Sequence, residues 1–373
     1  MSMKVGILTS GSDCPGLNAA IRGFGRAAQQ TYGMTVLGFT DGFRGLMEDK
    51  TVDLSGNALS DILTRGGTIL GTSRELPYKV LENGKTVDRT DLAVEVYHRH
   101  GLDGLVCIGG AETQNAAWHL ARAGLNILTL PKSSENSIAK TDITIGFDTA
   151  QLIAAEAIDR LHSTAHSNHR IIIVEITGSQ VGWLTLGSGI AAGADVILIP
   201  EIPYHVEKIA EAINTRLEAG KRFSIVAVSE GANSSELVAF FERSLKLNRL
   251  RDQGGNIEDR QAQINTLKKK YAGQTLFLAN RLEEMTGVES RVTILGYLLR
   301  GGTPSATDRV LATYLGTRAA DLLAEGKTGQ MVAYQGGKAV CVPLEDLFEQ
   351  TKPVPLDHHW ITAAKHVGTV FGD

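Results

Sequence analysis

The sequence predicts an α/β protein with a parallel sheet, and two observations support this class. Short apolar runs such as 4–8 and 105–108 are each followed by a glycine-containing turn and then by apolar residues at helical spacing. Strands that alternate with helices form βαβ units, whose strands run parallel. The 41 glycines against 9 prolines suit the many tight strand–helix turns of such a chain.

The first such unit begins the chain. An apolar run from Lys4 reads as a buried strand, 11–16 is a Gly/Ser/Asp/Pro turn, and a helix follows with apolar residues at Leu17, Ile21, Phe24 and Ala28. Free backbone N–H groups and the positive end of a helix dipole at such a turn bind phosphate. The turn matches neither common phosphate-binding fingerprint. An anion site and an ordinary strand–helix turn therefore both remain open.

Composition excludes several classes of function. The chain has 373 residues, 43% of them hydrophobic and 21% charged, and a net charge of −4. That balance argues against a nucleic-acid surface, which needs clustered positive charge. No apolar run reaches the ~18 residues of a membrane span, and the N-terminus has no signal-peptide pattern. The three cysteines are far apart, which suits a reducing compartment, so we expect a cytoplasmic protein without membrane contact.

The next elements are read in order from the turn signals. Gly33 is typical of a helix C-cap, and 35–39 is predicted as a strand. A short helix from Asp61 is expected to run into a glycine-rich loop that carries Arg65 and Arg74. Two arginines and several hydroxyls in one loop are suited to holding phosphate. A flexible surface loop is the alternative.

Two further strands, 105–108 and 125–130, flank a helix at about 113–123. Ligands of parallel sheets bind at the carboxyl ends of the strands. We therefore expect three loops at one sheet edge: 11–16, 109–113 and 132–137.

The second half repeats the alternation. A helix is predicted at 149–161, then a solvated loop at 163–169 with His166 and His169. Charged residues dominate 234–285, which reads as one or two outer helices, and a last long helix runs from Pro304 to Ala324. The predicted strands are 171–176, 196–199, 224–228 and 292–297.

Together these segments resemble the ATP- and pyrophosphate-dependent phosphofructokinase family over nearly the whole chain. The matching segments are 6–11, 18–22, 65–68, 144–150, 199–201 and 300–304. The resemblance implies two Rossmann-like three-layer α/β domains with the active site in the cleft, in a homotetramer or homodimer. It divides the chain into a donor domain, a sugar-phosphate domain with a helical insertion, and a C-terminal extension. These are 1–146 with 299–350, 147–298 with the insertion at 234–285, and 351–373.

The family transfers a phosphoryl group from ATP or pyrophosphate to the 1-hydroxyl of fructose 6-phosphate. Arg170 and Arg291 match arginines that reach the 6-phosphate from a neighbouring subunit, and Glu230 matches a carboxylate that binds sugar hydroxyls. The substrate-binding set implied by the resemblance also contains Arg300, Ser133 and Tyr297. Tyr297 stands where the family has a histidine, and 177–179 lacks the arginine of the family's sugar loop.

The catalytic positions depart further from the family. Glu135 matches the catalytic base, one methylene longer than the family's aspartate, and Arg74 is kept as a charge stabiliser. The second aspartate of that motif is Ser137. Mg²⁺ with ATP is expected from the family, but its aspartate is replaced by Ala111, so we assign no metal ligand.

The resemblance places the donor phosphates on two loops and one arginine. Glu112 stands where a glycine admits ATP and an aspartate goes with pyrophosphate, and Lys132 is typical of the pyrophosphate-dependent branch. The donor therefore stays open between ATP and pyrophosphate. The donor set is Gly11, Ser12, Arg74, Gly110, Glu112 and Thr113.

Five charged residues match family positions that bind effectors between subunits, although ordinary surface charges would look the same. They are Arg22, Arg26, Asp61, Lys221 and Arg222. Two functions remain in view. One is a weak phosphofructokinase; the other is an inactive sugar-phosphate sensor that assembles with an active paralogue.

Overall fold

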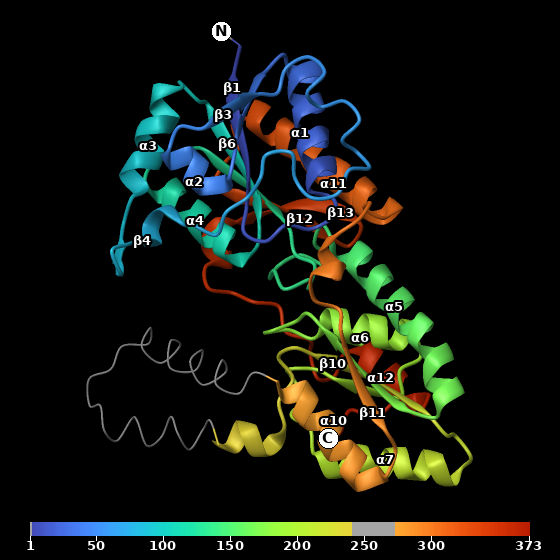
Figure 1. The fold of residues 1–373 in the computed structure, drawn as a ribbon. Coiled ribbons are helices and arrows are strands. Elements are labelled where there is room, and N and C mark those ends of the chain that lie inside the picture. The colour runs from blue at the N-terminus through green and yellow to red at the C-terminus, as the bar shows by residue number, and fades with distance from the viewer. Residues whose placement is uncertain (1, 241–272) are drawn as a thin grey trace. The chain divides into compact units, whose positions relative to one another are not determined.

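The computed structural model describes residues 2–240 and 273–373, which form two compact units (Figure 1). Unit 1 comprises Met1–Ala150 and Tyr297–Lys352, and unit 2 comprises Gln151–Gly296 and Pro353–Asp373. The segment after Lys352, which the sequence set apart as an extension, is thus part of unit 2. Most of the predicted insertion at 234–285 lies outside the described residues.

Unit 1 is organised around a seven-stranded sheet with the strand order β13-β12-β7-β6-β1-β2-β3. The pairs from β12 through β7, β6 and β1 to β2 are parallel, and the two edge strands β3 and β13 are antiparallel to their neighbours. The strands are β1 (Lys4–Ser10), β2 (Thr35–Phe39), β3 (Thr51–Asp53), β6 (Gly104–Gly109), β7 (Ile127–Pro131), β12 (Gln330–Gln335) and β13 (Lys338–Pro343). A separate hairpin pairs β4 (Val80–Glu82) with β5 (Lys85–Val87).

Both faces of this sheet are covered, because successive residues of its central strands pack into different apolar clusters. Val106 and Ile108 of β6 pack with α1 and α11, whereas Leu105 and Cys107 pack with α2, α3 and α4. The result is a three-layer α/β unit. Its α-helices are α1 (Leu17–Tyr32), α2 (Gly42–Met47), α3 (Thr90–Arg99), α4 (Ala111–Arg122) and α11 (Ala306–Ala324), with 3₁₀ turns η1 (Pro77–Lys79), η2 (Gly296–Arg300) and η3 (Leu344–Leu347).

Helices α1 and α11 pack closely because Gly316 of α11 has no side chain. A Cβ at Gly316 would lie 2.7 Å from the backbone nitrogen of Phe24 and 2.8 Å from the carbonyl oxygen of Ala20. In the first turn of α11, Asp308 is fully buried and accepts hydrogen bonds from the backbone N–H of Gly146 and of Thr149. This carboxylate thereby caps α5 (Phe147–Asn168), the helix that continues into unit 2.

Unit 2 contains a four-stranded, wholly parallel sheet with the order β11-β8-β10-β9. Its strands are β8 (Ile171–Ile176), β9 (Val196–Leu198), β10 (Ser224–Ser229) and β11 (Ser290–Ile294). Apolar residues of β8 and β9 pack with α7 and α10 in one apolar cluster. Besides α5, unit 2 includes the helices α6 (Trp183–Ala191), α7 (Val206–Glu218), α10 (Gln274–Thr286) and α12 (His359–His366).

Three local predictions were wrong. The segment from Asp61 forms turns instead of a short helix, and Asp61 itself has a left-handed φ of 57° that ends helical geometry. The predicted loop at 163–169 is helical to Asn168, and α5 stops only where His169 adopts a φ of 53°. The strand predicted to reach Tyr297 ends at Ile294, and Tyr297 lies in the 3₁₀ turn η2.

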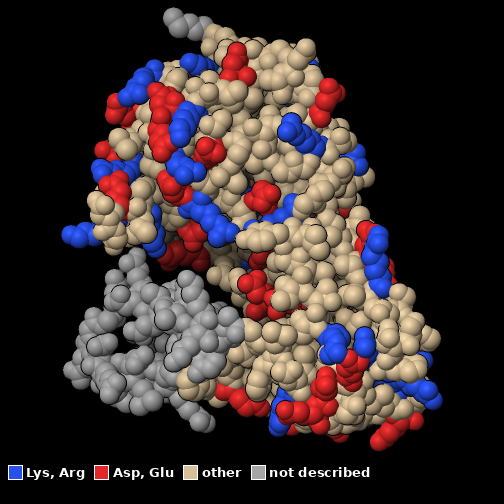
Figure 2. Space-filling model, viewed as in Figure 1, with Lys and Arg blue, Asp and Glu red and all other residues tan. Residues whose placement is uncertain are grey.

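No helix within residues 2–240 and 273–373 is long and apolar enough to cross a membrane. On the face drawn in Figure 2, the acidic and basic side chains of the described residues are interspersed. This mixture accords with the net charge of −4.

Candidate functional site

The three predicted loops of unit 1 do lie at one sheet edge. Strand β1 pairs with β6 so that Ser10 stands opposite Gly109, and β6 pairs with β7 so that Gly109 stands opposite Pro131. Parallel strands in this register end together. Gly11, Gly110 and Lys132 therefore leave the sheet side by side, and the backbone N–H of Lys132 donates to the carbonyl of Gly109 at 3.0 Å.

The loop after β1 is held by the chain segment 72–74. Gly11 has a φ of +83°, and its N–H donates to the carbonyl of Ser73 at 2.8 Å, while the hydroxyl of Thr72 donates to the carbonyl of Gly11 at 2.7 Å. Arg74 Nη2 lies 3.3 Å from Ser12 Oγ. The structure thus brings together Gly11, Ser12 and Arg74, which the sequence predicted as one set.

Lys132 is the positive charge at the centre of this edge. Its side chain is only 4% exposed, and its ammonium donates to the carbonyl of Ser12. Burial lowers the pKa of Lys132 below the usual lysine value. A Cβ at Gly11 would stand 3.6 Å from Lys132 Nζ and 3.9 Å from Thr113 Oγ1, so a backbone without a side chain keeps this space open. Lys132, Arg74 and the backbone of Gly11 therefore lie close together at this edge.

Glu112 is exposed in the first turn of α4 and has a partner that the sequence did not reveal. The hydroxyl of Tyr78 donates to Glu112 Oε2 at 3.2 Å, and the Tyr78 ring stacks on His119 with centroids 4.2 Å apart. Burial raises the pKa of Tyr78, so it stays a donor at neutral pH. No sequence motif marks Tyr78, because it approaches α4 only through the tertiary fold. Ala111 beside it carries no ligand atom.

The loop with Glu135 is closed by serine hydroxyls. Ser133 Oγ accepts hydrogen bonds from the backbone N–H of Glu135 at 3.1 Å and of Ser137 at 3.4 Å. Asn136 adopts a left-handed φ of 54° between them. Ser133 and Glu135 therefore share one tight turn. Ser137, at the position of the family's second aspartate, forms part of the turn and supplies no carboxylate.

Arg300 and Tyr297, both predicted to bind substrate, lie together in η2. The Arg300 guanidinium stands 5.1 Å from the centroid of the Tyr297 ring, which is 78% exposed. Arg300 Nε is buried and has no hydrogen-bond partner within the described residues. A buried, unsatisfied cationic donor favours an anionic ligand.

In unit 2, the loops after β8 and β10 are adjacent. Ser229 stands opposite Ile176, Ser229 Oγ donates to the carbonyl of Gly178 at 2.6 Å, and the N–H of Glu230 donates to the carbonyl of Ile176 at 2.8 Å. Glu230 is exposed, next to the loop 177–179. The structure therefore joins the two segments that the resemblance assigned to sugar recognition.

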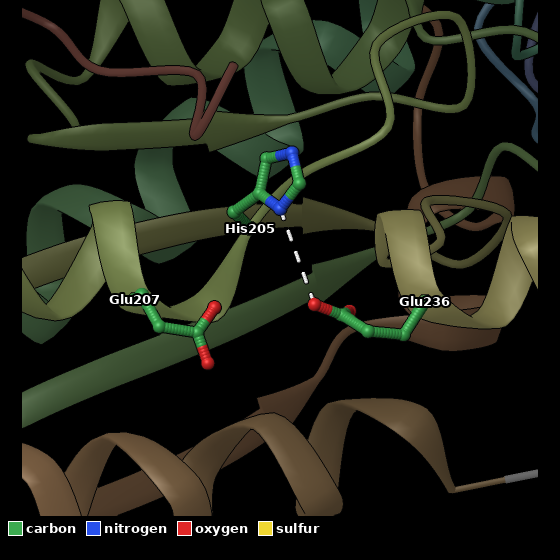
Figure 3. Close-up of side chains that lie close together, drawn as sticks. All are labelled: His205, Glu207 and Glu236. Carbon is green, nitrogen blue, oxygen red and sulfur yellow. Dashed lines mark ion pairs between the residues drawn. The ribbon is translucent and has the colours of Figure 1, made fainter.

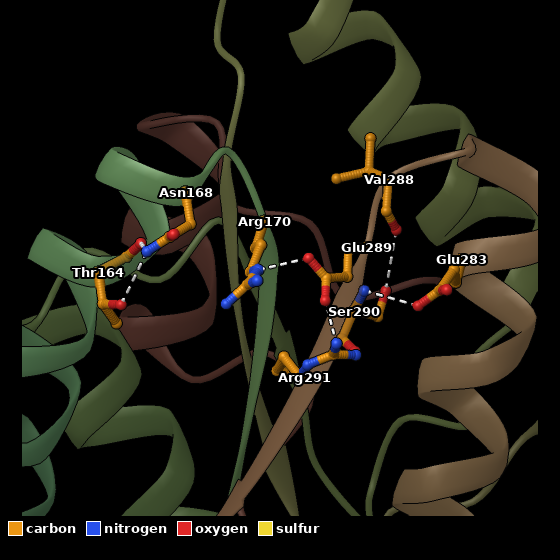
Figure 4. A network of polar contacts seen from close by, with 8 residues as sticks. All are labelled: Thr164, Asn168, Arg170, Glu283, Val288, Glu289, Ser290 and Arg291. Atoms are coloured by element: carbon orange, nitrogen blue, oxygen red, sulfur yellow. Dashed lines mark hydrogen bonds and ion pairs between the residues drawn. The ribbon is translucent and has the colours of Figure 1, made fainter.

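Arg170 and Arg291 lie at the opposite end of the same strands, because Arg170 precedes β8 and Arg291 pairs with Ile172 near its start. Glu289 stands between them (Figure 4). Arg170 Nε contacts Glu289 Oε2 at 2.5 Å, and Arg291 Nη2 binds the other carboxylate oxygen. These contacts lower the pKa of Glu289, with the Arg170 hydrogen bond as the largest cause. Within one chain, this pair is separated from Glu230 by the length of the sheet.

The five residues predicted to bind an effector are divided between the units. Arg22 and Arg26 are one turn apart on α1, and Arg26 Nη2 lies 3.0 Å from Ser60 Oγ, next to Asp61. The two cationic residues of unit 2 are exposed just before β10. These are Lys221 and Arg222.

One group of potential metal ligands appears among residues 2–240 and 273–373. Its members are His205, Glu207 and Glu236, with one ligand atom of each within 4.8 Å of the others (Figure 3). All three are exposed, and His205 Nδ1 lies 3.9 Å from Glu236 Oε1, as in an ordinary surface ion pair. We assign no ion to it. These residues belong to unit 2, whereas the loops after β1, β6 and β7 belong to unit 1.

Comparisons with known proteins show which family this chain is similar to. A family model described as "Phosphofructokinase" matches residues 4–323. An "ATP-dependent 6-phosphofructokinase" of Propionibacterium freudenreichii is 53% identical over 100% of both chains, and one of Spirochaeta thermophila is 47% identical over 99% of this chain and 97% of its own. A "Pyrophosphate--fructose 6-phosphate 1-phosphotransferase" of Amycolatopsis mediterranei is 41% identical over 96% of this chain and 98% of its own.

Solved structures are similar as well. A phosphofructokinase of Pichia pastoris in the T-state superposes with a TM-score of 0.78 and 29% identity, covering 99% of this chain and 37% of that one. This chain therefore spans little more than a third of the yeast subunit. A pyrophosphate-dependent phosphofructokinase from Nitrosospira multiformis has a TM-score of 0.77 at 18% identity, over 100% of this chain and 93% of that one, which supports the fold alone.

Proposed function

Because the chain belongs to the phosphofructokinase family, we propose that it transfers a phosphoryl group to the 1-hydroxyl of fructose 6-phosphate. The observation that carries this proposal is the sheet edge of unit 1, where the strands end together and where Lys132 and Arg74 both contact Ser12, next to Gly11. Full-length relatives that bear the name of this activity support it. Phosphoryl transfer requires mainly charge neutralisation and in-line positioning, and Lys132 and Arg74 would contribute the positive charge.

ATP is the donor that we propose first, since the relatives with 53% and 47% identity are named ATP-dependent. Gly11, Ser12 and Arg74 on one side and Gly110 with Thr113 on the other would bind its phosphates. The start of α4 adds the positive end of a helix dipole. Pyrophosphate is the competitor, favoured by Lys132 and by the acidic Glu112, because a carboxylate beside the nucleotide phosphates is repulsive.

Magnesium is expected with either donor. The acidic side chains in the loops after β1 and β6 are Asp13 and Glu112. Mg²⁺ in kinases is held by one or two carboxylates together with phosphate oxygens, so these two side chains would be the carboxylates available to an ion that arrives on the donor. Such an ion would offset the negative charge of the phosphates. Ala111 contributes nothing to it.

The residues that the resemblance assigned to the acceptor are proposed to bind fructose 6-phosphate. Arg300 with its unsatisfied Nε, Tyr297 and Ser133 would contact this substrate, and Glu230 would bind its sugar hydroxyls. Arg170 and Arg291 would serve the same substrate in a second copy of the chain, since Glu230 lies at the other end of their strands. A homodimer or homotetramer is therefore part of the proposal.

Glu135 is the proposed base that accepts the proton of the 1-hydroxyl. The turn at Ser133 fixes its backbone, and a carboxylate is retained there although the side chain is longer than in the family. Arg74 would stabilise the transferred phosphoryl group. The cytoplasm is the proposed location, and nucleotide or phosphoenolpyruvate regulation at Arg22, Arg26, Asp61, Lys221 and Arg222 is proposed as well.

A second candidate is a regulatory subunit that binds fructose 6-phosphate without transferring phosphate. The specific observation in its favour is the joint loss of two acidic groups, at Ala111 and at Ser137. Such a subunit would keep Arg300 and Glu230 and would assemble with an active paralogue.

One experiment separates these functions. The purified protein is titrated calorimetrically with fructose 6-phosphate, then with Mg-ATP and with pyrophosphate, and the same samples are assayed for fructose 1,6-bisphosphate. Binding of the sugar phosphate together with product formation from ATP supports the proposed ATP-dependent enzyme. Product formation from pyrophosphate alone supports the enzyme with pyrophosphate as its donor. Binding of the sugar phosphate without donor binding or product favours the regulatory subunit. Absence of binding to all three ligands contradicts both functions.

A further inference from the structure

The loop that carries Glu135 is joined to a distant chain segment just before unit 1 ends. Ile138 and Thr351 form an isolated antiparallel bridge, and the backbone N–H of Lys352 donates to the carbonyl of Ser137 at 3.0 Å. The carboxyl-terminal half of the loop is therefore held by a two-residue strand contact. No motif connects these segments in the sequence.

The side chain of Lys352 strengthens this junction. Its ammonium donates to the carbonyl of Thr141 at 2.8 Å and to the carbonyl of Asp142 at 2.9 Å. The same carbonyl of Asp142 accepts the side-chain amide of Asn136 at 3.1 Å. One oxygen thus links Lys352 to the residue that follows Glu135 in the chain.

We propose that Lys352 is a positioning residue for the reaction, which holds the loop 133–142 so that Glu135 meets the acceptor hydroxyl. The proposal rests on the proposed function of Glu135 as base. Asn136 keeps a left-handed φ, a conformation that costs free energy and persists only where the surrounding structure holds it. Lys352 and the bridge at Thr351 supply that enforcement from outside the loop. A displacement of about 1 Å at a catalytic group can cost on the order of 100-fold in rate.

The buried ammonium is suited to this role. Lys352 is half-buried, and burial lowers its pKa to about 8, while the charge of Asp142 opposes that shift. A buried lysine needs acceptors for its N–H groups, and two backbone carbonyls fixed in one loop satisfy them. Loss of the ammonium leaves those carbonyls with fewer donors, and the loop gains freedom.

The test compares Lys352→Met, Lys352→Arg and the control Lys338→Met, which changes an exposed lysine at the start of β13 in the same unit. In Lys352→Met we expect kcat to fall at least about 10-fold, while KM for fructose 6-phosphate changes less than about twofold. Lys352→Arg restores part of kcat, because a guanidinium also donates to carbonyls. Lys338→Met keeps wild-type kinetics.

Hydrogen exchange of residues 133–142 is measured on the same proteins, so that the proposal is tested apart from the activity. We expect faster exchange in this segment for Lys352→Met. An unchanged kcat in Lys352→Met overturns the positioning role, and so does an equal loss in Lys338→Met. If the wild type makes no product, the proposed function fails. Hydrogen exchange then tests by itself whether Lys352 holds the loop. Unchanged protection of residues 133–142 in Lys352→Met overturns that role.

Discussion

The hydroxyl oxygens of Ser133 and Ser137 lie 3.0 Å apart, so the loop after β7 closes on itself through two serines. The family has an aspartate at the second position. Here Glu135 is the one carboxylate between Lys132 and Ser137. Glu135 is therefore the side chain of this loop that we propose as the proton acceptor.

Glu135→Gln tests this conclusion. We expect kcat to fall by about 100-fold or more, because general-base catalysis contributes roughly 10²–10⁴-fold. KM for fructose 6-phosphate should stay within about threefold, since the amide occupies the same volume. Steady-state kinetics with a coupled assay for fructose 1,6-bisphosphate measure both constants. Lys338→Met, at an exposed position of β13, is the control, and a similar kcat in Glu135→Gln and wild type would exclude the proposed base.

The separation of Glu230 from Arg291 along the strands predicts complementation between subunits. Glu230→Ala and Arg291→Ala should each raise KM for fructose 6-phosphate at least about 10-fold, because each removes a charged contact with the substrate. When the two variants are co-expressed, a mixed dimer contains one site with both residues intact. Random mixing should restore about a quarter of the sites to wild-type KM.

The control for this experiment is Arg281→Ala, which breaks an exposed ion pair with Glu284 on α10. It should leave KM unchanged. A mixture that shows only the kinetics of its two components would contradict a site shared between chains, and a monomer in sedimentation experiments would do so as well.

Removal of the buried carboxylate of Asp308 should have a large effect on stability. Its buried carboxylate accepts three hydrogen bonds, two from backbone N–H groups at 2.8 Å and one from the hydroxyl of Thr149 at 2.5 Å. Asp308→Ala leaves these donors unpaired and should lower the free energy of unfolding by about 3 kcal/mol. Urea denaturation measures the loss. Asp321→Ala, at a partly exposed position of the same helix, should cost less than about 1 kcal/mol.

The lowered pKa of Lys352 should make the stability of the protein depend on pH. Its pKa is about 8 in the folded protein and 10.5 in the unfolded chain, so between these values the unfolded chain binds more protons. Stability contributed by this group therefore rises with pH across that window. We expect the unfolding free energy of the wild type to gain up to about 3 kcal/mol relative to Lys352→Met between pH 7.5 and 10.5. A constant difference across this range would contradict the lowered pKa.

The sequence by itself determined the fold class and most strands. The predicted strands 35–39 and 171–176 coincide with β2 and β8, because short β-branched and apolar runs between turn residues have few alternatives in a parallel sheet. It also determined that the loops after β1, β6 and β7 meet, since parallel strands end at one edge. The residues at which helical geometry is interrupted were less predictable. Asp61 and His169 both adopt left-handed φ values that side-chain patterns do not report.

Only the tertiary structure decided which polar side chains contact one another and which contact distant backbone groups. Glu289 between Arg170 and Arg291, Tyr78 on Glu112, and Lys352 under the loop of Glu135 all join segments that are distant in sequence or lack a motif. Hydrogen bonds and ion pairs depend on distances of a few tenths of an ångström, and hydrophobic periodicity carries no information at that scale. The sequence pattern locates the ends of the strands. The packing of helices and loops decides which charged side chains lie near those ends.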